Sequence, residues 1–258
     1  MLSDLQDLYA YRVLIQALVM RDLKARYRGS ALGLLWTLLN PLLLMGVYAL
    51  VFSVYMRIEM ERYTVFLLCG LLPWIWISSS CLMGATSVIE GAGLIKKVFF
   101  PVQVLPTVTV LFNLVNFLLS LPILFAFLLF YDVQLGWASL TLPLIMTCQF
   151  AFTLGLTLIV AAASVRYRDI PQIMSHLVTF WFFLTPILYP ITRVPESFRG
   201  LVSLNTFAPF AIAYQDVLMY NRIPSFGAFM IMICVGLISL PCGLFVFSYF
   251  RWSFAEEV

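Results

Sequence analysis

Four basic side chains form the stretch of this sequence best suited to bind an anion. Arg21, Lys24, Arg26 and Arg28 lie within eight positions and account for four of the fifteen lysines and arginines in the 258-residue chain. Guanidinium and ammonium groups bind phosphate oxygens, and arginine can do so through two parallel hydrogen bonds. A charge-free apolar run, residues 29–56, follows directly. The cluster therefore predicts either a lipid-phosphate site or a topological anchor at anionic headgroups, and the anchor is the simpler interpretation of each residue alone.

The composition indicates a membrane protein. Hydrophobic residues make up 63% of the chain and charged residues only 10%, whereas a soluble domain carries about 25% charged residues. The net charge is only +3, and most basic residues lie beside apolar runs. This distribution argues against nucleic-acid binding, which requires a basic surface.

Six uncharged windows are long enough for a membrane helix. A helix needs about 20 apolar residues to cross the hydrocarbon, and the shortest of the six windows, residues 170–192, has 23. We expect an all-α integral membrane protein with six transmembrane helices, at about residues 31–55, 64–87, 102–130, 138–163, 171–189 and 226–250. A seventh window, residues 200–215, is too short and too polar to cross. It predicts an outer re-entrant segment, with short helical pieces at about 196–204 and 209–220.

The positions of the charges predict the topology and the division of the chain. We expect a cytoplasmic interfacial amphipathic helix within residues 1–30, a six-span core over residues 31–250 and a cytoplasmic tail over residues 251–258. With the N-terminus inside, ten lysines and arginines lie on the cytoplasmic side and five on the other. Both termini are therefore predicted to be cytoplasmic.

No catalytic or metal-binding motif is present in the sequence. None of the three lysines lies in a G-x-x-x-x-G-K-[ST] phosphate loop. The five cysteines all fall in apolar windows without a C-x-x-C pair, which predicts neither a metal site nor a disulfide framework. The centres of the expected spans carry no charged residue, unlike those of ion-coupled transporters. We expect a transport subunit that is not an enzyme and whose energy comes from another chain.

Five motifs, in order along the chain, resemble those of the type-2 ABC exporter permeases. They are R-D-x-K-x-R-Y-R-G-S-x-L-G-x-x-W-x-x-x-N-P at 21–41, I-K-K-V-F-F-P at 95–101, R-Y-R-D-I at 166–170, T-P-I-L-Y at 185–189 and S-F-A-E at 253–256. Within that family the chain is similar to the O-antigen polysaccharide export permeases. The resemblance covers essentially the whole chain. One departure is Asn205-Thr-Phe-Ala-Pro209, where relatives often have Asn directly before Pro.

The resemblance implies a homodimer in the bacterial inner membrane. Each subunit would dock on a separate nucleotide-binding ATPase subunit, which would hold ATP and Mg²⁺, with no cofactor on this chain. The cargo would be a lipid-linked glycan such as the O-antigen of lipopolysaccharide. Teichoic acid, capsule or a lipophilic small molecule remain alternative cargoes of the same kind of permease. A passive lipid scramblase or channel is an alternative from another class.

Two cytoplasmic segments are candidates for contact with the ATPase. Residues 88–100 form the expected coupling helix, with Glu90, Lys96 and Lys97 as polar contacts. Arg166 and Asp169 lie in the short turn between the fourth and fifth expected spans. A positive-inside anchor and local ion pairing are the simpler interpretations of these two segments.

Aromatic side chains are candidates for the lining of a glycan channel, because rings stack on the apolar faces of sugars without fixing one register. In the family that the chain resembles, the first and fifth spans line the channel. The resemblance therefore implies a channel-lining role for aromatic residues on these two expected spans, by span and not by motif. The candidates are Trp36, Tyr48, Phe52, Tyr55, Phe180, Trp181, Phe183 and Tyr189. Contact with lipid is the alternative for each of them, since aromatic residues also gather at membrane interfaces.

Overall fold

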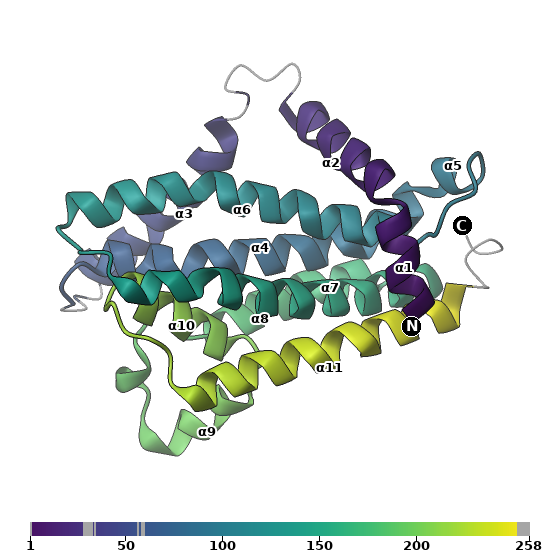
Figure 1. The fold of residues 1–258 in the computed structure, drawn as a ribbon. Helices are drawn as coiled ribbons and strands as arrows, with labels where there is room; N and C mark the ends of the chain where they lie inside the picture. The colour runs from purple at the N-terminus through teal and green to yellow at the C-terminus, as the bar shows by residue number, and fades with distance from the viewer. Residues whose placement is uncertain (1, 28–32, 34, 56, 58–59, 252–258) are drawn as a thin grey trace.

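A computed structural model describes residues 2–27, 33, 35–55, 57 and 60–251. Every regular element among these residues is a helix (Figure 1). In chain order the elements are α1 (Leu2–Ala10), α2 (Arg12–Tyr27), α3 (Leu35–Ala49), the π-helical η1 (Leu50–Tyr55), α4 (Tyr63–Glu90), α5 (Ala92–Ile95), α6 (Val104–Phe130), the 3₁₀ helix η2 (Trp137–Thr141), α7 (Leu142–Arg166), α8 (Ile170–Leu184), the 3₁₀ helix η3 (Ile191–Arg193), α9 (Glu196–Leu204), α10 (Ala208–Leu218) and α11 (Phe226–Phe250).

Four helical stretches are long and apolar enough to cross a membrane. They are α4, α6, η2 with α7 (Trp137–Arg166), and α11, with 25 to 30 residues each. At 1.5 Å per residue these lengths are roughly 37–45 Å, which exceeds the roughly 30 Å of bilayer hydrocarbon. A helix pairs its backbone N–H and C=O groups within itself, as a lipid environment requires. The protein is therefore an all-helical membrane protein with four candidate spans among the described residues.

The remaining two expected spans correspond to shorter helices. In the region of the first expected span, α3 continues as the π-helical η1. Its apolar stretch, Leu39–Phe52, is shorter than the four candidate spans. In the region of the fifth, α8 has only 15 residues, a length of roughly 22 Å. It ends at Leu184, and the backbone of the next residue, Thr185, is extended. Pro186 follows, and a residue before proline is disfavoured in the helical conformation.

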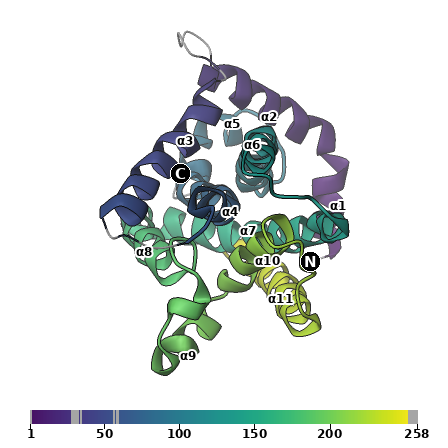
Figure 2. The same cartoon turned by 90° about the vertical axis from the view of Figure 1, so that its left-hand side faces the viewer.

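Helix α4 is the centre of the bundle. It packs against α3, α6, α7, α8 and α10, and 78% of its most apolar window is buried, compared with 22% for α11. Seen along the bundle, α2 and α3 lie on two sides of α6, and α11 lies beyond α7 (Figure 2). The apolar core therefore forms around α4, while α11 leaves most of its surface for lipid or a partner.

Glycines let α7 and α11 approach closely. A Cβ added at Gly155 would clash with the backbone of Ser239, and one added at Gly243 would lie 2.7 Å from the Cα of Gly155. Small residues at a helix crossing let backbones meet, and this close packing is a main source of helix association in lipid.

The N-terminal segment forms two helices, because the expected continuous helix is interrupted at Tyr11. Its apolar residues Leu8, Ile15, Leu18 and Val19 are buried in one cluster with residues at the start of α6. This apolar stripe therefore packs on the bundle. Helix α1, α5 and the end of α11 all lie at the same end of the bundle (Figure 1).

Two helices occur where the sequence predicts short pieces between the last two expected spans. Helix α9 has largely exposed residues, whereas α10 is mostly buried and packs against α4, α7 and α11. The α10 segment is therefore part of the core at the end of the bundle opposite to α5 (Figure 1).

Candidate functional site

One face of α6 lines two cavities in succession. Its cavity-lining residues recur at intervals of one, three or four positions, which places them in one stripe along a helix. The first half of the stripe lines a smaller cavity at the α5 end and consists of Leu105, Val108, Thr109 and Phe112. The second half lines a larger cavity and consists of Asn113, Asn116, Phe117 and Ser120. The stripe from Leu105 to Ser120 is about 22 Å long at 1.5 Å per residue, most of the depth of a bilayer core.

Helix α4 supplies the opposite wall of both cavities. Its lining residues include a second stripe with helical spacing: Leu72, Ile75, Trp76 and Ser79 in the larger cavity, then Met83, Thr86, Ser87 and Glu90 in the smaller one. Because α4 and α6 pack against each other, the two stripes contribute neighbouring walls to both cavities.

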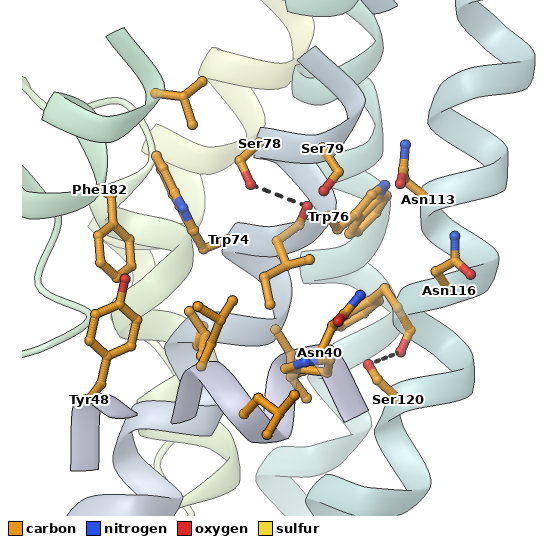
Figure 3. A pocket seen from close by; sticks show the side chains of 18 of the residues that line it. Asn40, Tyr48, Trp74, Trp76, Ser78, Ser79, Asn113, Asn116, Ser120 and Phe182 are labelled. Carbon is orange, nitrogen blue, oxygen red and sulfur yellow. Dashed lines mark hydrogen bonds between the residues drawn. The ribbon is translucent and has the colours of Figure 1, made fainter. Parts of the chain in front are cut away.

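The larger cavity has a volume of about 930 Å³, lies between α3, α4, α6 and α8, and is open to the surface. Apart from Arg26, its polar groups include neutral amides and hydroxyls from Asn40, Ser78, Ser79, Asn113, Asn116 and Ser120. Figure 3 shows Asn113 extending from α6 toward the α4 side of the cavity, where Trp76 and Ser79 lie, with Asn116 one turn further along α6. Aromatic rings line the other side, with Tyr48 and Phe182 at a centroid distance of 5.4 Å.

The smaller cavity has a volume of about 750 Å³ and lies between α2, α4, α5 and α6. Arg21, Asp22, Arg26 and Glu90 line it. Nη2 of Arg21 lies 2.8 Å from Oδ1 of Asp22, and both side chains are exposed. The charge of Arg21 is thus partly balanced by its neighbour.

Arg26 belongs to both cavities. Its guanidinium carbon lies 5.2 Å from the centroid of the Phe112 ring on α6, a cation–π geometry. Asn113, the next residue of α6, lines the larger cavity. This contact holds a positive charge at the junction between the two cavities, where it can bind an anion.

The eight aromatic candidates for the channel separate into three groups. Trp36, Tyr48 and Phe183 line the larger cavity. Tyr55 and Phe180 are exposed, with 73% and 69% of their surface accessible. The other three candidates are partly buried against the apolar core.

Phe52, Trp181 and Tyr189 each have a partner inside the bundle. The Phe52 ring lies 6.5 Å from that of Tyr63. Nε1 of Trp181 donates to Oδ1 of Asn205 at 2.7 Å. The hydroxyl of Tyr189 donates to the carbonyl of Phe183 at 2.9 Å.

The basic cluster is only partly brought to the cavities. Arg21 and Arg26 line them, whereas Lys24 is exposed on α2 and lines neither. Arg28 lies outside the described residues.

The candidates for ATPase contact lie at the α5 end of the bundle. Glu90 ends α4, and Lys96 and Lys97 follow α5; all three are exposed. Arg166 and Asp169 are exposed at the turn from α7 to α8. Phe99 is 99% exposed, whereas Phe100 is buried, so a single aromatic ring projects beside the two lysines.

Side chains from three other segments hold the turn that follows α8. This turn contains the T-P-I-L-Y motif at residues 185–189 and is not helical. Nε2 of Gln215 donates to the carbonyl of Pro186 at 3.0 Å, and the hydroxyl of Tyr63 donates to the carbonyl of Leu188 at 2.9 Å. Nδ2 of Asn205 donates to Oγ1 of Thr185 at 2.9 Å. Irregular backbone at membrane depth requires such partners.

The polar side chains of α6 were not among the residues that the sequence analysis selected. Asn113, Asn116 and Ser120 lie in an apolar window at intervals of three and four residues. Amides at helical spacing inside an otherwise apolar span predict a polar stripe. That signal could have identified the cavity wall on α6, although not the helix opposite to it.

The four long apolar helices and the polar groups between them are typical of a multi-pass membrane protein. The chain belongs to the ABC-2 type transporter family, whose model matches residues 13–219.

Similar proteins are known along the full length of the chain. It is 42% identical over 260 residues to the O-antigen export system permease protein RfbA of Myxococcus xanthus, with all of both chains covered. It is 34% identical to a protein of the same name from Klebsiella pneumoniae, over 94% of each chain. The polysialic acid transport protein KpsM of Escherichia coli is 23% identical over 75% of this chain and 76% of its own length.

Proposed function

We propose that this chain is the channel-forming permease subunit of an ATP-driven exporter, which moves lipid-linked polysaccharide of the O-antigen type across the bacterial inner membrane. The observation that carries the proposal is the 42% identity to an O-antigen export permease over the whole of both chains. The likeness to a polysialic acid transport protein is lower and covers three quarters of the chain. Cargo of the O-antigen type is therefore favoured over capsule.

In this proposal six helices cross the membrane, with both termini in the cytoplasm. The helix α3 with η1 and the short helix α8 complete the four longer spans. The α9–α10 segment re-enters from the outer side and meets the end of α8. The hydrogen bonds from Tyr63, Asn205 and Gln215 to the turn at 185–189 support this arrangement, because they satisfy backbone and hydroxyl groups that lipid would leave unpaired.

The working unit is a homodimer with two copies of a separate ATPase subunit, which binds ATP and Mg²⁺. Exposed apolar side chains on α3 and α8 support a second copy on that side, since Leu43, Val47, Phe180 and Phe183 are all more than half exposed. At the other end, Lys96, Lys97 and the exposed ring of Phe99 offer cations and an apolar anchor to the ATPase. Glu90, Arg166 and Asp169 add charged contacts there.

The lipid phosphate binds at the junction of the two cavities, with Arg26 as its main ligand. Arg26 is fixed over Phe112, whereas Arg21 shares its charge with Asp22. A planar guanidinium binds two phosphate oxygens at once, which lysine cannot do.

Export of the glycan to the cell surface, measured by immunoblot in a strain that depends on this permease, tests the proposal. We expect Arg26→Gln to reduce export at least tenfold and Arg26→Lys to restore part of it, because a point charge replaces a bidentate ligand. Arg12→Gln is the matched control. Arg12 lies on the same helix, donates to the carbonyl of Tyr9 at 3.1 Å and lines neither cavity. Wild-type export by the Arg26→Gln variant would contradict the phosphate assignment.

A further inference from the structure

The larger cavity contains a polar group that the protein itself leaves unused. The indole nitrogen of Trp76 is fully buried, and it has no hydrogen-bond partner among the described residues. The indole ring itself is fixed, because it stacks on Phe117 with a centroid distance of 5.3 Å. A buried donor without a partner is unfavourable, so this N–H points to an acceptor on a bound molecule.

Other polar groups surround the same space. Ser79 lies one turn further along α4, and Asn113 lies opposite on α6 (Figure 3). Nδ2 of Asn113 donates to the carbonyl of Thr109 at 2.9 Å, which fixes the orientation of its amide group. Donors and acceptors from two helices therefore face one volume beside the rings of Trp74 and Phe182.

We propose that this cavity, within a single subunit, binds the neutral sugar, with or without an N-acetyl group, that is attached directly to the lipid phosphate. The inference rests on the proposed function, because it requires a lipid-linked glycan. Hydroxyl and acetamido groups match the indole N–H, the serine hydroxyls and the asparagine amides, and the adjacent rings can stack on the apolar face of a sugar ring.

The charge of the cavity selects the class of sugar. Arg26 is the only charged side chain among the described residues that line the cavity, and it lies at the junction with the smaller one. A sugar carboxylate deeper in the cavity would be desolvated without a counter-charge, which is strongly unfavourable. The site therefore favours a neutral sugar over a uronic or sialic acid.

The position of Arg26 determines which sugar of the chain is bound. A phosphate at Arg26 places its neighbouring sugar in the larger cavity, because Arg26 lies over Phe112 and the next residue, Asn113, already lines that cavity. A polyprenyl chain in the same space would leave the Trp76 N–H unpaired. The lipid-proximal sugar is thus the occupant that satisfies both charge and hydrogen bonds.

The experiment measures binding of two defined lipids to the protein purified from native membranes, with its accompanying subunits, in bilayer nanodiscs. The probes are polyprenyl diphosphate and the same lipid bearing one N-acetylhexosamine. We expect the sugar to tighten binding about tenfold, equivalent to roughly two net hydrogen bonds. A third probe that bears one uronic acid is expected to bind no more tightly than the bare lipid.

The double variant Trp76→Phe with Ser79→Ala removes two of the proposed contacts and keeps a ring at position 76. We expect it to lose most of the tenfold sugar effect while its affinity for the bare lipid stays unchanged, which also reports correct folding. Ser79→Ala alone provides a milder second variant, with an expected loss of about threefold for one net hydrogen bond. Ser80→Ala is the matched control, because Ser80 donates to the carbonyl of Trp76 and does not line the cavity.

The outcomes separate this inference from the proposed function. If the bare lipid binds and the sugar adds nothing, or if the sugar effect survives in the double variant, the sugar site is refuted and the proposed function stands. If neither lipid binds to the wild-type protein, the lipid-linked cargo is refuted and the sugar site with it. Equal tightening by the uronic acid would refute the selection for neutral sugars.

Discussion

Asn205 is the residue whose replacement should most clearly separate the α9–α10 segment from the rest of the bundle. Its side chain joins the end of α8 to the start of α10. Oδ1 accepts from Nε1 of Trp181 at 2.7 Å and from the backbone N–H of Phe207 at 3.0 Å. Nδ2 donates to Oγ1 of Thr185 at 2.9 Å and to the carbonyl of Leu184 at 3.2 Å.

The expected loss of stability follows from these four hydrogen bonds. A net contribution of about 0.5–1.5 kcal/mol for each bond, reduced because the site is partly exposed, predicts that Asn205→Ala lowers the free energy of unfolding by about 3 kcal/mol. Trp181→Phe removes one of the four bonds and leaves a ring to pack against Trp74, Phe152 and Phe207. We expect that change to cost about 1–2 kcal/mol.

A double-mutant cycle isolates the Trp181–Asn205 bond. If the bond contributes as the geometry indicates, the double variant is less destabilised than the sum of the single variants by about 1 kcal/mol. Unfolding is followed by far-ultraviolet circular dichroism during titration of mixed micelles with denaturing detergent, since Trp181→Phe would alter the tryptophan fluorescence. Ser203→Ala on α9 removes only a local bond to the carbonyl of Gly200 and serves as the control. A coupling energy below about 0.3 kcal/mol, the usual error of additivity, would refute the account of Asn205 as the link between α8 and α10.

The other two predictions concern the α7–α11 crossing and the ATPase contact. Gly243→Ala places a Cβ 2.7 Å from the Cα of Gly155 and should lower the free energy of unfolding by about 1–3 kcal/mol. Gly227→Ala on the same helix is the control, because an added Cβ there has nothing within 4 Å, and it should leave stability unchanged in the same detergent titration. Equal unfolding midpoints for the two variants would contradict the close crossing. Replacing Lys96 and Lys97 together by Ala should reduce both glycan export and co-purification of the ATPase subunit, because both cations project at the exposed end beside Phe99. Unchanged export with unchanged co-purification would show that residues 88–100 do not transmit the ATPase motion.

The sequence alone determined the class of protein and the approximate positions of the four long helices. Charged groups are excluded from hydrocarbon, so the charge-free windows had to contain the membrane helices, and α4, α6, α7 and α11 lie within a few residues of the expected spans. The two short helices α9 and α10 also occur near their expected positions, because Pro195 directly precedes α9 and Pro209 lies in the first turn of α10, where proline is tolerated at the start of a helix. The motifs were sufficient to indicate the family, since they depend on order and spacing along the chain.

The tertiary structure decided which polar and aromatic side chains meet. Asn113 and Asn116 are amides in an apolar window, and only the packing of α6 on α4 places them across from Trp76 and Ser79. Similarly, Trp181 shares the sequence features of the other channel candidates, but the fold pairs it with Asn205, 24 positions away. Hydrophobic periodicity identifies the face of a helix that is buried, whereas the partner of that face depends on contacts between residues far apart in the chain. For the same reason the junction at Arg26 could not be derived from the basic cluster, because its position is fixed by a ring on another helix.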